Sequence, residues 1–90
     1  MEGINMKKIW IVRERMEWHN CNADDDTFAY ATEELAKKGL IELYEETKRF
    51  LADEEEEIER ETLTSNSGSI ITESDDYYNI WVEEIDMFNN

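Results

Sequence analysis

The chain has 90 residues, 40% of them hydrophobic and 37% charged, and its formal net charge at pH 7 is −15. This length suits one domain over residues 1–90 with a modest core, and the 11% aromatic content indicates a folded chain rather than a disordered one. An electrostatic field of this sign repels nucleic acid and anionic membranes and attracts basic surfaces, which argues against direct binding of DNA or RNA.

The sequence gives no sign of membrane insertion or secretion. No apolar run approaches the roughly 18 residues that a membrane span needs, and no signal peptide is recognisable. The one cysteine, Cys21, has no partner for an internal disulfide. These features together predict a cytoplasmic protein.

The first predicted element is a β-strand over Lys7 to Trp18, which follows a flexible arm over residues 1–6. Trp10, Val12 and Met16 share one face of this strand at a period of two, the spacing of a half-buried strand. Glu14 is the one charged residue on that face. We therefore expect this strand to pack its tryptophan-bearing face against a core.

A second, shorter strand is predicted over residues 28–31, after a polar loop that contains Asp24 to Asp26. The turn-forming composition of that loop suits a β-hairpin with the first strand. The alternative is that residues 28–31 form the opening turn of the helix that follows them. The strand is the favoured interpretation.

A long amphipathic helix is predicted over Thr32 to Arg60, with Thr32 as its N-cap. Gly39 follows two lysines, a combination that also ends helices, but one continuous helix is favoured because the apolar stripe keeps its phase across the glycine. The acidic run Asp53 to Glu57 interrupts that stripe, so we expect the last two turns to overhang the sheet as an acidic ridge. The predicted stripe comprises Ala36, Leu40, Leu43, Tyr44, Thr47, Phe50, Leu51 and Ile58.

Two further strands are predicted, over Ser69 to Glu73 and over Tyr77 to Phe88, with a turn at residues 73–76 between them, and a strand could also begin at Glu61. The apolar residues of the last strand change parity at Glu83 and Glu84, which predicts a β-bulge there. The predicted fold class is α+β: a small antiparallel sheet in β-β-α-β-β order, packed against one long central helix.

Recognisable catalytic and metal-binding patterns are missing from the sequence. His19 and Cys21 are the only histidine and cysteine, whereas tetrahedral zinc needs four ligands. Asp24 to Asp26 lack the alternation and central glycine of an EF-hand loop, and the three glycines lie too far apart for a phosphate-binding loop. We predict a non-enzymatic protein without a metal or cofactor.

In size, acidity and lack of catalytic motifs the chain resembles the small proteins with which bacteriophages block host defences, such as anti-CRISPR proteins, restriction-blocking DNA mimics and the inhibitor of uracil-DNA glycosylase. The opening KKIWIVRERMEW, the helical TEELAKKGL and the closing YYNIWVEEIDMF also resemble the β-first, helix-middle, β-last layout of phage accessory proteins. The resemblance implies an inhibitor that acts in the host cytoplasm on a CRISPR or restriction effector.

The first functional hypothesis is therefore an acidic inhibitor that occupies the nucleic-acid-binding surface of a basic protein. Dense carboxylates can hold the same Arg and Lys side chains that hold phosphates. The candidate partner-binding residues on the ridge are Asp53, Glu54, Glu55, Glu56, Glu57, Glu59 and Glu61. Those that join them if the fold brings them to one side are Asp24, Asp25, Asp26, Asp75, Asp76, Glu83 and Glu84.

The second hypothesis is a homo-oligomer or adaptor whose contacts are aromatic, with acidity serving only solubility. Aromatic side chains dominate the binding energy of many interfaces. The candidate anchors are Tyr77, Tyr78, Trp81 and Phe88. Salt separates the hypotheses, because a charge-driven complex weakens steeply as salt rises and an aromatic one does not.

Overall fold

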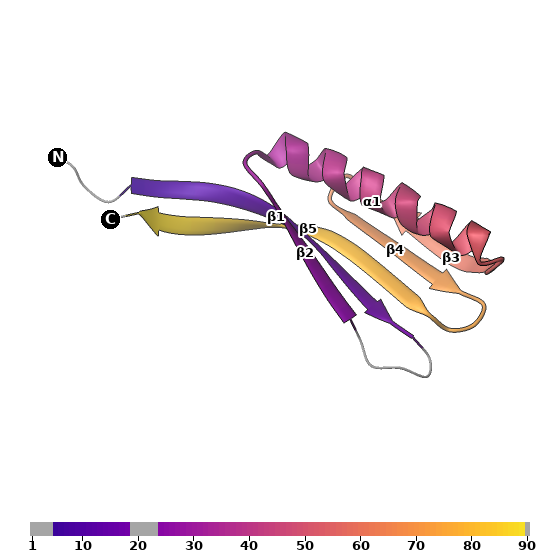
Figure 1. The fold of residues 1–90 in the computed structure, drawn as a ribbon. Coiled ribbons are helices and arrows are strands. Elements are labelled where there is room, and N and C mark those ends of the chain that lie inside the picture. Colours follow the sequence, from indigo (N-terminus) through magenta and orange to yellow (C-terminus); the bar gives the residue numbers. More distant parts are fainter. Residues whose placement is uncertain (1–4, 19–23, 90) are drawn as a thin grey trace.

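One α-helix lies across one face of a five-stranded antiparallel sheet (Figure 1). The computed structural model describes residues 5–18 and 24–89. The elements are β1 (Asn5–Glu17), β2 (Asp24–Tyr30), α1 (Glu33–Asp53), β3 (Ile58–Leu63), β4 (Ser67–Thr72) and β5 (Tyr77–Asn89). The strands lie in the order β2-β1-β5-β4-β3. The predicted α+β class is confirmed, and β3 adds a strand to the predicted sheet.

The first two strands pair side by side. β2 runs antiparallel to β1, with Tyr30 opposite Trp10 and Asp24 opposite Met16. Residues 28–30 therefore belong to a strand, as favoured, and not to the opening of the helix, while Ala31 lies between the two elements. Asp24 to Asp26, predicted as loop, belong to the same strand. The flexible arm was predicted for residues 1–6; residues 1–4 lie outside the described part, and the next two begin β1.

β1 and β5 form the long central pair of the sheet. Their register runs without interruption from Asn5 opposite Asn89 to Glu17 opposite Tyr77, so the bulge predicted at Glu83 and Glu84 is wrong. The apolar residues of β5 switch from one face of the sheet to the other because α1 covers only part of this strand. Val82 packs against the core beneath α1, whereas Ile85 lies on the opposite face. Figure 1 shows the paired ends of β1 and β5 extending beyond the helix.

The helix begins as predicted and passes through Gly39. Thr32 caps it, its Oγ1 accepting a hydrogen bond from Leu35 N–H at 3.2 Å. A Cβ at Gly39 would overlap the phenol ring of Tyr30 on β2, which lies against the helix backbone. Glycine therefore allows a close approach of α1 and β2, and this close packing offsets its poor helix propensity.

The predicted end of the helix, at Arg60, is wrong. α1 ends at Asp53, where Glu56 N–H donates to Leu51 O (2.9 Å) and Glu55 N–H donates to Ala52 O (3.1 Å). These are the two hydrogen bonds of a Schellman motif, which turns the chain back toward the sheet. The acidic run therefore forms a connection to β3 and not an overhanging helical ridge.

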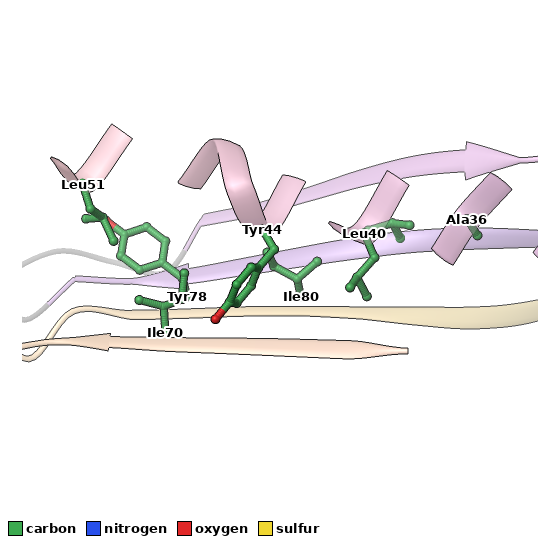
Figure 2. Close-up of a cluster of buried hydrophobic side chains, with 8 residues drawn as sticks. Ala36, Leu40, Tyr44, Leu51, Ile70, Tyr78 and Ile80 are labelled. Atoms are coloured by element: carbon green, nitrogen blue, oxygen red, sulfur yellow. The ribbon is translucent and has the colours of Figure 1, made fainter. Parts of the chain in front are cut away.

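The core lies between α1 and the sheet. Leu40, Tyr44 and Leu51 of the helix point toward Ile70, Tyr78 and Ile80 of the strands (Figure 2). Val12 of β1 and Ala36 of α1 complete this buried cluster, and Trp10, Met16 and Trp18 pack against its margin.

Two residues of the predicted helical stripe lie elsewhere: Phe50 is largely exposed, and Ile58 belongs to β3. Phe50 is 54% exposed because it lies on the side of α1 that looks toward β1 and β2, whereas Leu43 is half-buried and packs against the margin of the core. The prediction of a buried side chain is therefore wrong for Phe50.

Candidate partner-binding surface

Two acidic segments that are distant in sequence lie side by side at one end of the molecule. Glu73 N–H donates to Glu57 O (3.0 Å), and Ser74 Oγ donates to Glu56 Oε2 (3.2 Å). We call residues 53–57 and 73–76 together the acidic end. They carry eight carboxylates and no Lys or Arg. Six of these carboxylate residues are exposed, and the other two, Glu56 and Asp76, are half-buried.

The backbone at the acidic end is strained where its acids lie. Among the described residues, the non-glycine positions with positive φ are Glu55 (57°) and Asp75 (66°), one in each acidic segment. This left-handed conformation costs an L-residue about 1 kcal/mol or more, less for Asp, whose side chain can bond locally. Glycine is the usual residue at the position that Glu55 occupies after a helix. The sequence thus keeps a carboxylate where glycine would be more stable.

The helix dipole also disfavours these charges. Asp53 and Glu54 lie at the C-terminal end of α1, the negative end of its dipole, and the last turn contains no basic residue. Each such acid typically costs about 0.3–1 kcal/mol. Dipole, backbone conformation and mutual repulsion therefore all oppose acid at this end of the fold.

The three aspartates of β2 lie at the same end of the sheet. Asp24 is opposite Met16 on β1, and Met16 is opposite Tyr78, two residues beyond the acidic end. Two strand spacings separate β2 from β5, about 10 Å. The Asp25 carboxylate already has a cation, since Arg15 Nη1 lies 3.3 Å from its Oδ1, and Asp26 is exposed. The aspartates thus flank the acidic end without merging with it.

Four other predicted residues do not join the acidic end, because the register places them along the strands. Glu61 accepts a hydrogen bond from Lys48 Nζ at 3.0 Å, Glu83 pairs with Arg13, and Glu84 Oε2 lies 3.1 Å from Lys8 Nζ. Glu59 is exposed on the edge strand β3. Conversely, Glu73 belongs to the acidic end but was not among the predicted site residues, although the predicted turn at 73–76 contained it.

The aromatic anchors of the second hypothesis are also divided. Tyr78 is buried in the core, where its hydroxyl accepts a hydrogen bond from Trp18 Nε1 at 3.2 Å. Tyr77 is 42% exposed, and Trp81 is half-buried on the sheet face away from α1. The side chain of Phe88 lies outside the described part of the chain.

Residues 5–18 and 24–89 contain neither a clustered set of metal ligands nor a membrane-spanning helix. No group of three or more His, Cys, Asp or Glu residues there is placed to hold a metal ion. No helix in that part is long and apolar enough to cross a membrane. His19 and Cys21, the residues considered for zinc or nucleophilic chemistry, lie outside it.

No family model, no curated protein and no solved structure matches this chain. The structure therefore assigns the protein to a fold class alone: an α+β domain in which one helix packs on a five-stranded antiparallel sheet.

Proposed function

We propose that the protein is a non-enzymatic inhibitor that docks its acidic end on a basic, nucleic-acid-binding surface of another protein. The observation that carries this proposal is that the fold gathers eight carboxylates from two separate segments, three of them (Asp53, Glu54 and Glu55) at positions where the helix dipole or the backbone conformation disfavours the residue present. Natural proteins keep such locally unfavourable residues mainly where function needs them.

The mechanism is competition. A protein surface built to hold phosphates presents Arg and Lys, and fixed carboxylates can occupy those cations in place of nucleic acid. The molecule measures 58 × 25 × 17 Å, and the acidic end lies at one tip of its long axis, opposite the paired ends of β1 and β5 (Figure 1). A narrow acidic tip can enter a cleft that a nucleic acid would otherwise fill. Host defence and DNA-processing proteins have such clefts.

The test is capture of basic proteins from a nuclease-treated bacterial lysate on immobilised protein, washed at low salt and at about 1 M salt. The triple variant Glu55→Gln, Glu57→Gln, Glu73→Gln neutralises exposed acids of the acidic end. Its matched control, Glu33→Gln, Glu34→Gln, Glu45→Gln, removes the same charge from the helix surface. We expect the first variant to bind the captured protein at least tenfold more weakly, about 1.4 kcal/mol, and the control to bind like wild type.

Three results would contradict the proposal: a captured protein that resists high salt, equal losses in both variants, or no captured nucleic-acid-binding protein. Equal losses would mean that net charge alone attracts the partner.

A homo-oligomer or adaptor is the second candidate, favoured by the sheet face away from α1. On that face Ile9 lies opposite Ile85, and Trp81 lies opposite Arg13, which is paired with Glu83. Paired charges can be covered at less cost than unpaired ones. Light scattering measures the oligomeric state. A wild-type dimer that becomes a monomer in the Trp81→Ser variant would support this candidate. A monomeric wild-type protein would rule out the homo-oligomer.

A further inference from the structure

A groove runs along the side of α1 that faces β1 and β2. It consists of three adjoining hollows: one between Phe28, Tyr30 and Leu43, one between Met16, Trp18 and Phe50, and one that Phe50 and Trp18 share with Glu54. We call this feature the helix-side groove. Its helical wall extends from Gly39 to Glu54, about 22 Å at 1.5 Å per residue.

The floor of the helix-side groove is aromatic and partly open to solvent. Phe50 of α1 is 54% exposed, and Phe28 of β2 is 43% exposed. Periodicity predicts Phe50 to be buried with Leu40 and Leu51, which are fully buried. Phe50 thus belongs to the apolar stripe of α1 but is left largely exposed by the helix and strands of residues 5–18 and 24–89. Large exposed apolar residues around one groove mark a binding surface more often than isolated ones do.

The rim of the helix-side groove is uniformly acidic. Glu42, Glu46 and Glu54 line it from the helix, and Asp26 lines it from β2. No Lys or Arg is among the described residues that line the three hollows. The last hollow includes Glu54, Glu56 and Asp76, so the groove opens directly into the acidic end. An aromatic floor and an acidic rim select a ligand that is apolar on one side and basic on its flanks.

We propose that the helix-side groove binds a basic amphipathic helix of the partner protein. The apolar stripe of that helix packs on Phe28, Phe50 and Trp18, and its Lys and Arg residues pair with the acidic rim. The proposal rests on the proposed function for the sign of the partner's charge, and it adds a site and a ligand class.

An amphipathic helix fits because the groove follows about four turns of α1, and helix-in-groove recognition uses residues at i, i+3, i+4 and i+7. A second copy of this chain fits poorly, since each copy carries a net charge of −15 and the rim is itself acidic. Charge complementarity therefore favours a basic partner over self-association.

The test uses a synthetic peptide of about 16 residues, with leucines at helical stripe positions and arginines on the flanks, a length that matches the groove. A control peptide has the same composition in an order that removes the stripe. The protein carries Trp10→Phe and Trp81→Phe, which leaves Trp18 as its one tryptophan. Binding is followed by the emission of Trp18, which lines two of the hollows.

We expect the amphipathic peptide to shift the Trp18 emission to the blue and to bind at least tenfold more tightly than the control peptide. Phe50→Ser and Phe28→Ser should each weaken binding at least tenfold. Ile41→Ser is the matched control variant, because Ile41 is 45% exposed on α1 and lines none of the three hollows. Circular dichroism checks that each variant is folded.

Equal binding of the two peptides, an unchanged Trp18 emission on binding, or equal effects of Phe50→Ser and Ile41→Ser would each overturn the inference. The proposed function fails separately. If the amphipathic peptide binds in the groove but the immobilised protein captures no basic protein, the groove stands and the inhibitor proposal falls. If a basic protein is captured through the acidic end but the peptide does not bind, the inhibitor proposal stands and the groove proposal falls.

Discussion

Glu14 is a carboxylic acid on the face of β1 that packs beneath the helix. Its side chain is 5% exposed, and its Oε2 lies 3.2 Å from Thr47 Oγ1, which in turn lies 2.9 Å from Leu43 O. A threonine hydroxyl has one proton, so it cannot fully donate to both acceptors. A protonated Glu14 resolves this conflict by donating to Thr47, which then donates to Leu43. Burial is the main reason that the pKa of Glu14 is raised; the hydrogen bond with Thr47 acts against this shift, and the nearby Asp26 and Glu46 add to it.

Replacing Glu14 by Gln should stabilise the protein at neutral pH. Because its pKa is raised in the folded state, Glu14 favours folding most below its unfolded pKa of about 4.3, and this advantage is lost as pH rises through the folded pKa. Gln keeps the neutral, hydrogen-bonding form at every pH. We expect a gain in melting temperature of several degrees at pH 7, since about 1 kcal/mol shifts a domain of this size by about 4–8 °C.

Melting curves across pH check this prediction. The gain of Glu14→Gln over wild type should shrink toward pH 4, and the exposed Glu45→Gln serves as a control that removes the same charge. A Glu14→Gln variant that melts below wild type at pH 7 would show that the ionised carboxylate is the stabilising form.

At the scale of the elements, α1 and β2 contact each other where the ring of Tyr30 lies against Gly39. Gly to Ala inside a helix normally gains about 1 kcal/mol. Here the added methyl would overlap Tyr30, and overpacking of this kind typically costs about 1–3 kcal/mol. We expect Gly39→Ala to destabilise wild type but to stabilise a Tyr30→Ala background.

Urea unfolding of the four proteins, wild type, the two single variants and the double variant, gives the coupling between the two positions. Additive effects, with Gly39→Ala stabilising both backgrounds equally, would mean that Tyr30 does not pack against the helix.

The sequence predicted the elements that have their own periodic signal. The alternation in β1, the cap at Thr32 and the turn at 73–76 each depend on local chemistry, and all three are confirmed. β3 was harder to predict because it is an edge strand in which only Ile58 is partly buried, so its residues do not alternate.

The end of α1 was missed for a related reason. Leu51 and Ile58 are seven residues apart, a spacing that places two residues on the same face of a helix. Both reach the core, but Leu51 lies in α1 and Ile58 lies in β3. The glutamates between them are good helix formers and include no glycine to signal the turn. The acidic end was predictable as composition, but its assembly from two segments depends on strand register, which sequence periodicity does not give.

At the scale of the whole molecule, the net charge of −15 opposes folding. Surface ion pairs such as Lys8–Glu84 and Lys48–Glu61 act in the other direction, but each contributes only about 0–1 kcal/mol. We expect repulsion to outweigh these pairs, so raising NaCl to about 0.5 M should raise the melting temperature by several degrees as the screening length falls. Calorimetry at several NaCl concentrations measures the slope. A melting temperature that falls with salt would mean that the ion pairs outweigh the repulsion.

The central β1–β5 pair also sets the order in which the molecule can assemble. β1 and β2 are neighbours in the chain, as are β3, β4 and β5, so each group can pair early. Within the sheet of the described residues, the ladder between β1 and β5 joins the two halves, and contacts that distant in sequence form slowly. The acidic end belongs to the half that contains β3, β4 and β5. The helix-side groove is lined by Phe28 from one half, Phe50 from the helix and Tyr78 of β5 from the other half, so it is complete only when the two halves have joined.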